Sequence, residues 1–327
     1  MRMLKSLLLR LVSLSVTLLI LSLTVFILSR LMPGDPLTAF YGDVADTFSD
    51  EELARARAYL NLDAPLFPQY LTWLSHTLQG DLGFSYRYHM PVAELLAPLI
   101  INTLLLGALS FVIIFALALL LALLCVRYEE RLIDRAIRAA GTVTYLLPSF
   151  WVGLILILIF ALTLKWLPAS GAYAPGESHS LSSRLTHLVL PVTVMVLSHL
   201  WYFGALLRNR LADEVREPYV LNMRAAGKGR WAVLVTECLP AVLPTLFNVM
   251  AIAIPHVLSG TFVVEAVFNY PGVGAMAVES VRNHDYSLLL ALILITSLAV
   301  VAAAQLSASA GGRLDPRLKR SARERCV

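Results

Sequence analysis

Charged residues are scarce in this chain. They make up 15% of the 327 residues, whereas hydrophobic residues make up 58%, and the mean hydropathy is +0.73. A soluble globular protein typically has about 25% charged and about 45–50% apolar residues. This shortage of charge excludes a soluble enzyme, a disordered chain and a nucleic-acid binder.

Cysteine is also rare. The three cysteines, Cys125, Cys238 and Cys326, lie far apart and form no CxxC pair. An odd number at such spacing predicts neither a disulfide framework nor a zinc site. We therefore expect buried or incidental thiols.

The sequence lacks the common catalytic motifs. It has no GxxxxGK[ST] phosphate loop, because Gly227-Lys228-Gly229 has neither the upstream glycine nor the following Ser or Thr. It has no HExxH zinc helix and no GxSxG nucleophile elbow, and its seven histidines are scattered. We expect no catalytic residue, cofactor or metal site, and no ATP hydrolysis by this chain.

Long charge-free runs are the dominant feature. A membrane-spanning helix needs about 20 apolar residues, and six windows approach or exceed that length: Leu11–Ser29, Leu95–Val126, Ala139–Leu164, Leu185–Leu207, Cys238–Val264 and Tyr286–Gly312. We predict an all-α polytopic membrane protein with six transmembrane helices, although five or seven stay open.

The lengths of the first two windows bear on their assignment. The apolar run of the first window exceeds the roughly 7–15 residues of a signal peptide, so we expect a retained anchor. The second window is longer than one perpendicular crossing requires, and we expect its first residues to form a lead-in segment.

The basic residues predict an orientation. With the N-terminus inside, most of the 26 Lys and Arg residues fall on cytoplasmic segments, as the positive-inside rule requires. Both termini are then cytoplasmic, and the pI near 9.0 needs no nucleic-acid partner. The predicted organisation is an N-terminal anchor helix (1–30), an outer segment (31–94), a transmembrane core (95–312) with an inner loop (208–239), and a basic tail (313–327).

The outer segment between the first two helices is acidic and mixes helix and turn patterns. Ser49 and Glu52 precede an apolar residue at the spacing of a capping box, which predicts a helix N-terminus. Residues 33–36 and 80–83 are rich in glycine, proline and aspartate, which predicts turns. We expect a small capping subdomain, with direct substrate contact as the alternative.

The inner loop Arg208–Leu239 holds the most informative pattern. Helix-forming residues run to Ala226, and Gly227 then offers a left-handed helix stop. Apolar helical spacing resumes over Trp231–Leu239 and leads into Pro240. The loop is therefore predicted to form two short helices whose small tip lets another protein approach, with a generic connecting hairpin equally open.

The last outer loop contains Pro271-Gly272 followed by a second glycine, which predicts a defined bend. Glu265 precedes it at the membrane edge, either as an ordinary interfacial carboxylate or as part of a translocation path. The few ionisable groups in the membrane windows disfavour a secondary transporter. A passive channel stays open on these grounds.

An ordered set of motifs carries a resemblance that covers nearly the whole chain. The matching residues are 30–36, 60–66, 69–70, 80–85, 91–92, 148–151, 166–171, 219–220, 224–225, 227, 265, 268, 271–274, 285–286 and 314–317. In this order they resemble the permease subunits of ATP-binding-cassette importers, specifically the first permease of the dipeptide, oligopeptide and nickel branch. Any one segment is weak, whereas the ordered set is specific.

The resemblance implies a non-catalytic transport subunit in the cell inner membrane. Its implied partners are a second homologous permease, two cytoplasmic ATP-binding subunits, an extracytoplasmic substrate-binding protein and membrane lipid, but no nucleic acid. The family's EAA loop lodges in a cleft of the ATPase, which assigns coupling to Glu217, Tyr219, Arg224, Ala225, Ala226 and Gly227. The outer gate, or contact with the binding protein, is assigned to Glu265, Pro271, Gly272, Val273 and Gly274.

Three residues depart from the branch pattern. The branch usually has a basic or histidine residue at Glu237, asparagine near Ala241, and often lysine at Ala226. These departures leave the ATPase partner open. The expected substrate is a di- or oligopeptide, with nickel or a metal chelate as the alternative; a stand-alone channel and a structural or sensory membrane protein are the competing classes.

Overall fold

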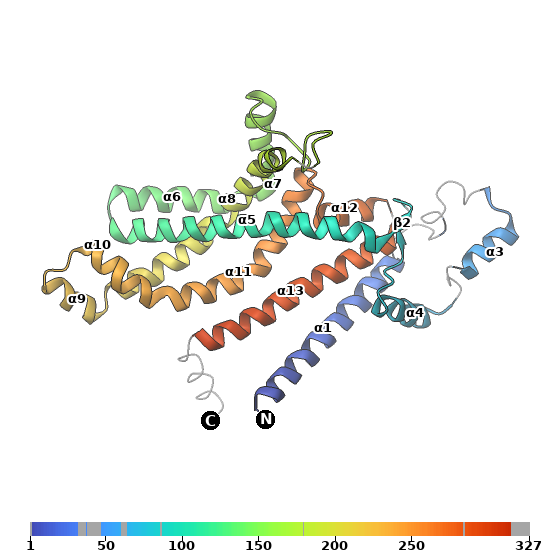
Figure 1. The fold of residues 1–327 in the computed structure, drawn as a ribbon, viewed down its shortest axis with the longest axis horizontal. Helices are drawn as coiled ribbons and strands as arrows, with labels where there is room; N and C mark the ends of the chain where they lie inside the picture. Colours follow the sequence, from blue (N-terminus) through green and yellow to red (C-terminus); the bar gives the residue numbers. More distant parts are fainter. Residues whose placement is uncertain are drawn as a thin grey trace. The chain divides into compact units, whose positions relative to one another are not determined.

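The computed structural model describes residues 2–31, 37, 47–59, 64–85, 87–178, 180–283 and 285–314. These residues are mostly helical, with one two-stranded antiparallel hairpin. The chain divides into two compact units, the first comprising Met1–Thr103 and Pro271–Ala302, and the second Leu104–Tyr270 and Ala303–Val327. Helices α5 and α13 belong to both units because each crosses a boundary (Figure 1).

The first unit holds the outer segment and the helices around it. Its elements are α1 (Arg2–Leu31), α3 (Asp50–Tyr59), α4 (Leu66–Leu78), β1 (Phe84–Ser85), β2 (Met90–Pro91), the start of α5 (Val92–Arg127), α12 (Val273–Arg282) and most of α13 (Tyr286–Leu314). An aromatic group joins α1 to α4, where Phe26 packs edge-on against Tyr70 with ring centroids 5.5 Å apart. The hydroxyl groups of Ser22 and Tyr70 are 2.9 Å apart and hydrogen-bonded.

The second unit holds the remaining helices. Its elements are the rest of α5, α6 (Leu132–Leu146), α7 (Ser149–Leu156), the π-helical segment η2 (Ile157–Thr163), α8 (Leu181–Val215), α9 (Pro218–Ala225), α10 (Arg230–Val233), the π-helical segment η3 (Leu234–Cys238) and α11 (Leu239–Val267). Helix α8 packs against both α6 and α11, and apolar side chains such as Leu106, Ile114 and Phe203 fill the core. In Figure 1, α9 and α10 form a hairpin at the end of this unit that also holds the turn between α5 and α6.

Helices coincide with all six expected windows. Within the described residues, four helices are long and apolar enough to cross a membrane: Val92–Arg127, Leu181–Val215, Arg230–Val267 and Tyr286–Gln305. A bent helix pair raises the number to five, and Val12–Leu28 is a shorter apolar helix. The polytopic helical fold is confirmed, while the count of six spans stays a prediction.

The third window differs from the expected single helix. Helices α6 and α7 meet at a 100° bend, and the residues at the break are Leu147 and Pro148. Proline has no N–H and pushes the residue before it into extended backbone, and Leu147 accordingly has φ −79° and ψ 132°. Continuous apolar composition hid this break.

Two other helices run further than expected. The second window has no separate lead-in, because α5 is one 36-residue helix with Pro98 in its first turns. Likewise, the expected short helix over Trp231–Leu239 continues through α10 and η3 into α11. The inner loop therefore contains one short helix, α9, followed by the start of a long one.

Two of the local signals predicted in the outer segment are confirmed, the capping box at Ser49 and the turns at residues 80–83. Helix α3 begins after Ser49, whose backbone N–H donates to Glu52 Oε2 over 2.9 Å, and Glu52 N–H lies 3.4 Å from Ser49 Oγ, as a capping box requires. Gly80 and Gly83 have φ of +88° and +85°, which places both in turns. The expected turn over 33–36 and the matching segment 60–63 lie outside the described residues.

The described cysteines are buried free thiols, as expected for Cys125 and Cys238. Cys326 and the basic tail from residue 315 lie outside the described part of the chain.

Candidate functional site

The α9–α10 hairpin, residues Glu217–Val233, contains all six residues predicted to couple to an ATPase. It begins where α8 stops at Arg216, whose N–H reaches back to Asp213 O over 3.1 Å. Glu217 is extended, and Pro218 occupies the first helical position, where its missing N–H removes no hydrogen bond. The carbonyl of Glu217 accepts from Val220 N–H over 3.0 Å. The chain thus turns sharply between two helices without losing backbone hydrogen bonds.

Gly227 ends α9 in the left-handed conformation, as predicted, with φ +89°. Its N–H donates to Arg224 O over 3.0 Å, and the N–H of Lys228 donates to Met223 O over 3.1 Å. These two bonds are the Schellman motif, which needs a residue that accepts positive φ. A Cβ at Gly227 would meet nothing within 4 Å. The requirement for glycine here is therefore one of backbone conformation, and the space beside it is open.

The base of the hairpin is anchored by a separate apolar cluster. Val220 on α9 and Val233 on α10 are fully buried against Cys238, Val126 and Leu211. A cavity of about 10 Å³ inside this cluster holds at most one water molecule. The base of the hairpin is therefore closely packed, and this cavity is too small for a ligand.

Tyr219 secures the bend between α8 and α9. Its hydroxyl donates to Glu214 Oε1 over 2.7 Å. Burial, and then this hydrogen bond to a carboxylate, raises the pKa of Tyr219 above its ordinary value. The phenol therefore stays protonated at physiological pH and keeps donating.

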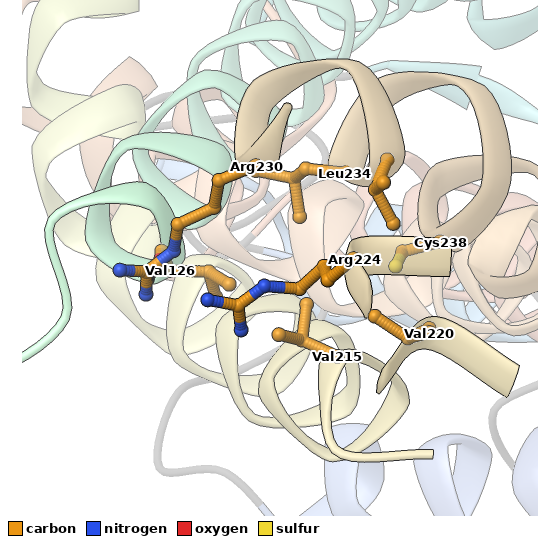
Figure 2. A pocket seen from close by; sticks show the side chains of 8 residues that line it. Val126, Val215, Val220, Arg224, Arg230, Leu234 and Cys238 are labelled. Carbon is orange, nitrogen blue, oxygen red and sulfur yellow. Dashed lines mark hydrogen bonds between the residues drawn. The ribbon is translucent and has the colours of Figure 1, made fainter. Parts of the chain in front are cut away.

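The tip of the hairpin is exposed and made of small residues. Ala225, Ala226 and Gly227 are all exposed. Figure 2 shows the guanidinium groups of Arg224 and Arg230 lying beside each other at the edge of the apolar cluster. Arg230 donates to Val126 O over 3.2 Å, whereas Arg224 is exposed. The tip thus offers an exposed surface of small residues with a flanking positive charge.

Of the three departures from the branch pattern, Ala226 lies in the α9–α10 hairpin and the other two follow it. Glu237 Oε1 on η3 lies 3.1 Å from the Nζ of Lys228, so that the turn after α9 is tied to the following helix. Ala226 is at the exposed tip and Ala241 is exposed on α11. Glu237 is therefore paired with a hairpin residue, whereas the two alanines leave exposed surface.

The predicted outer bend, residues 271–274, lies in the first unit and is anchored to α5. Asn102 Nδ2 donates to Pro271 O over 2.8 Å, and the N–H of Val273 donates to Thr103 Oγ1 over 2.8 Å. Val273 itself is buried, and Gly272 precedes the first residue of α12. The bend is therefore the anchored start of a helix.

Two motifs of the first unit meet at the start of α13. Ser85, which ends the segment 80–85, donates to the buried carboxylate of Asp285. The other oxygen of Asp285 accepts from Leu288 N–H over 3.2 Å and so caps α13. The hydrogen bond between Ser85 and Asp285 thus fixes the hairpin β1–β2 to the start of α13. Nearby, burial and then a hydrogen bond with Glu279 raise the pKa of Tyr88 to about 12.

Glu265 lies in the second unit and is fully buried on α11. Its carbonyl accepts from Tyr270 N–H over 2.9 Å, and Tyr270 is buried as well. Arg184 on α8 stacks on the ring of Tyr173 at 5.5 Å. Because the side chain of Glu265 is buried, it is not exposed for direct contact with another protein.

Sequence reasoning missed two residues that shape the hairpin, Glu214 and Arg230. A glutamate five residues before Tyr219 was visible, but the proline between them hid that the two side chains meet.

Among the described residues, no group of three or more His, Cys, Asp or Glu side chains is placed to hold a metal ion.

Two families of known proteins match the chain. The model described as "Binding-protein-dependent transport system inner membrane component" matches residues 114–320. The model described as "Binding-prot-dependent transport system membrane comp, N-term" matches residues 3–104. Together these matches include both the α9–α10 hairpin and the whole outer segment, residues 31–94.

Relatives and a solved structure agree with these matches. The chain is 28% identical over 89% of its length to the oligopeptide transport system permease protein AppB of Bacillus subtilis, covering 92% of that protein. It is 28% identical over 88% of its length to the metal-staphylopine import system permease protein CntB of Staphylococcus aureus, covering 89% of that protein. An inward-facing structure of the MetNI methionine ABC transporter matches 66% of this chain and 96% of its own, with TM-score 0.50 and 15% identity. At that identity the structural likeness shows the fold alone.

Proposed function

Since the chain belongs to the family of binding-protein-dependent transport system inner membrane components, as an ABC importer permease of the peptide and nickel branch, we propose that it forms half of a translocation pathway driven through its α9–α10 hairpin. It is a multi-pass protein of the inner membrane and a transport component. Its proposed partners are a second homologous permease, two cytoplasmic ATP-binding subunits and an extracytoplasmic binding protein. The chain itself is non-catalytic in this proposal.

The observation that carries the proposal is the combination of an exposed small tip with a packed base. Ala225, Ala226 and Gly227 let another surface approach to backbone distance, while Val220 and Val233 bury the base of the hairpin. A force applied at such a tip moves the attached helices because the hairpin cannot bend at its root. Glu217, Tyr219 and Arg224 complete the proposed docking surface.

The membrane arrangement is part of the proposal. We take all six apolar helical segments as spans, with the bent pair α6 and α7 supplying one of them. Both termini then face the cytoplasm, which the distribution of Lys and Arg supports. The α9–α10 hairpin falls on the cytoplasmic side, where ATP-binding subunits can reach it.

The outer bend and Glu265 have separate proposed roles. Residues 271–274 start an anchored helix, which suits them to transmit movement of α5 at the outer gate. Glu265 is buried, and we propose that it acts inside the protein at this gate.

The proposed substrate is a di- or oligopeptide, with nickel or a metal chelate as the alternative. The name of the Bacillus subtilis relative supports the first and that of the Staphylococcus aureus relative supports the second. Uptake of a radiolabelled peptide and of ⁶³Ni, measured in a strain lacking this chain and in the same strain carrying it, separates them. Restored uptake of nickel alone would overturn the peptide assignment.

Coupling is tested by two substitutions at one position. The permease complex, with its ATP-binding subunits, is reconstituted in liposomes with the binding protein outside. We expect Gly227→Trp to abolish transport and transport-coupled ATP hydrolysis while membrane insertion continues. The matched control, Gly227→Asn, keeps most activity because asparagine tolerates positive φ. Unchanged transport by Gly227→Trp would remove the hairpin from coupling.

A further inference from the structure

The turn between α5 and α6, residues Tyr128–Arg131, is held in a strained conformation by one buried carboxylate. Glu130 has φ +64°, a region that side-chain-bearing residues adopt uncommonly. Its N–H donates to Asp134 Oδ2 over 3.1 Å. Asp134 is completely buried. The shape of this α5–α6 turn therefore depends on Asp134.

Asp134 is also the partner of an arginine far away in the sequence. Its Oδ2 lies 3.2 Å from Arg138 Nη2 on the same helix and 3.7 Å from Arg208 Nη2 on α8. A buried carboxylate is tolerated only when it is paired and hydrogen-bonded. Arg208 therefore ties α8 to α6 at the residue that shapes the α5–α6 turn.

Two more arginines, one before α9 and one after it, bind residues at or beside the α5–α6 turn. Arg216, at the end of α8, lies 2.9 Å from Glu129 Oε1 in the turn. Arg230, at the start of α10, donates to Val126 O at the end of α5 over 3.2 Å. The segments that enter and leave α9 thus hold two neighbouring places, the α5–α6 turn at Glu129 and the end of α5 at Val126.

We propose that the α5–α6 turn is a second element of the coupling machinery and moves together with the α9–α10 hairpin. Arg208 and Arg216 are the positioning residues that hold α6 and this turn to α8. The inference rests on the proposed function. A displacement of α9 changes the positions of α8 and α10. Because α8 is tied to α6 and to the α5–α6 turn, and α10 is tied to the end of α5, the same displacement is delivered to α5 and α6.

The pair Glu129–Arg216 is the best place for a test, since its side chains are 22% and 68% exposed and tolerate a change of charge. The single variants Glu129→Arg and Arg216→Glu place like charges opposite each other, and the double variant restores the pair in reverse. The complete complex in liposomes is assayed for substrate transported per ATP hydrolysed. We expect each single variant to lower this ratio about fivefold, within the range that double-mutant cycles give for one ion-pair network, and the double variant to recover it.

The matched control is Arg210→Glu, the same charge change at an exposed position on α8. It should leave the ratio at the wild-type value. A purely stabilising role for the pair would change the amount of assembled complex but not the substrate transported per ATP. Wild-type ratios in both single variants would overturn the inference, as would a loss that the double variant does not recover.

A distance measurement decides the inference without a charge change. Spin labels are attached to Arg131→Cys in the turn and Asn222→Cys on α9, both at exposed positions, in a chain that also carries Cys326→Ser. We expect the same label distance in the nucleotide-free and ATP-trapped complex, because the two elements move together. A shift in this distance on ATP binding would overturn the inference, even if a charge variant failed to assemble.

The Gly227→Trp variant separates this inference from the proposed function. If Gly227→Trp uncouples transport while Glu129→Arg and Arg216→Glu do not, the α9–α10 hairpin keeps its role and the α5–α6 turn loses the one assigned here. If Gly227→Trp transports normally, the proposed function itself fails.

Discussion

The hydroxyl of Tyr219 donates to Glu214 Oε1 over 2.7 Å, across the bend where α8 ends and α9 begins. Pro218 lies between them and prevents one continuous helix. The hydrogen bond therefore sets the angle at which α9 leaves α8. This angle determines where the exposed tip of the α9–α10 hairpin stands.

Removing that hydroxyl should loosen the hairpin without unfolding the protein. Tyr219→Phe keeps the ring and loses one partly exposed hydrogen bond, which predicts a loss of about 0.5–1 kcal/mol. We expect a small fall in the thermal unfolding midpoint and a larger fall in substrate transported per ATP. The control is Tyr145→Phe on α6, far along the chain from the hairpin. Equal effects of both variants on the transport ratio would contradict the role of Tyr219.

Close packing of α6 on α8 makes a second prediction. A Cβ at Gly141 would lie 2.3 Å from the indole of Trp201, whereas one at Gly107 would lie 3.5 Å from Leu258. Gly141→Ala should therefore destabilise the protein by about 1–3 kcal/mol through overpacking. Gly107→Ala should be tolerated, because its Cβ makes an ordinary contact and alanine favours helix.

Thermal unfolding of the two glycine variants in the same detergent measures the difference. A lower midpoint for Gly107→Ala than for Gly141→Ala would show that α6 does not lie against Trp201 as described.

The carboxylate of Asp285 supports a third prediction. It accepts from Ser85 and caps α13 while buried. Asp285→Ala leaves the Ser85 hydroxyl and the N–H groups of Arg87 and Leu288 without this acceptor and should reduce stability by about 2–3 kcal/mol. Asp285→Asn keeps an acceptor oxygen and should lose less. The ranking is read from unfolding midpoints, and equal midpoints for the two variants would contradict the capping role.

The sequence predicted the features that depend on local backbone chemistry. The capping box of Ser49 and Glu52 and the left-handed Gly227 are each decided within a few residues, so the pattern alone was sufficient. The six apolar windows located helices for the same reason. The bend at Leu147–Pro148 was missed because hydropathy outweighed proline in the reading of a long apolar run.

The arrangement around the hairpin could not be predicted in the same way. Asp134 and Arg208 are 74 positions apart, and nothing in one sequence shows that α6 and α8 bring them together. The tie between Arg230 and Val126 has the same character, since it joins the ends of helices that are distant in sequence. Such pairs are determined by packing, whereas the α9–α10 hairpin itself was visible in its glycine and small residues.

The accessibility of the hairpin tip to a thiol reagent on each side of the membrane tests whether ATP-binding subunits can dock on it. A single reactive cysteine is placed at Ala226 in a chain carrying Cys326→Ser and is treated with a membrane-impermeant thiol reagent. If the hairpin docks on cytoplasmic ATP-binding subunits, we expect no labelling in intact cells, strong labelling in inverted membrane vesicles stripped of those subunits, and protection when they are returned. Labelling of Ala226→Cys in intact cells would place the hairpin outside and exclude such docking.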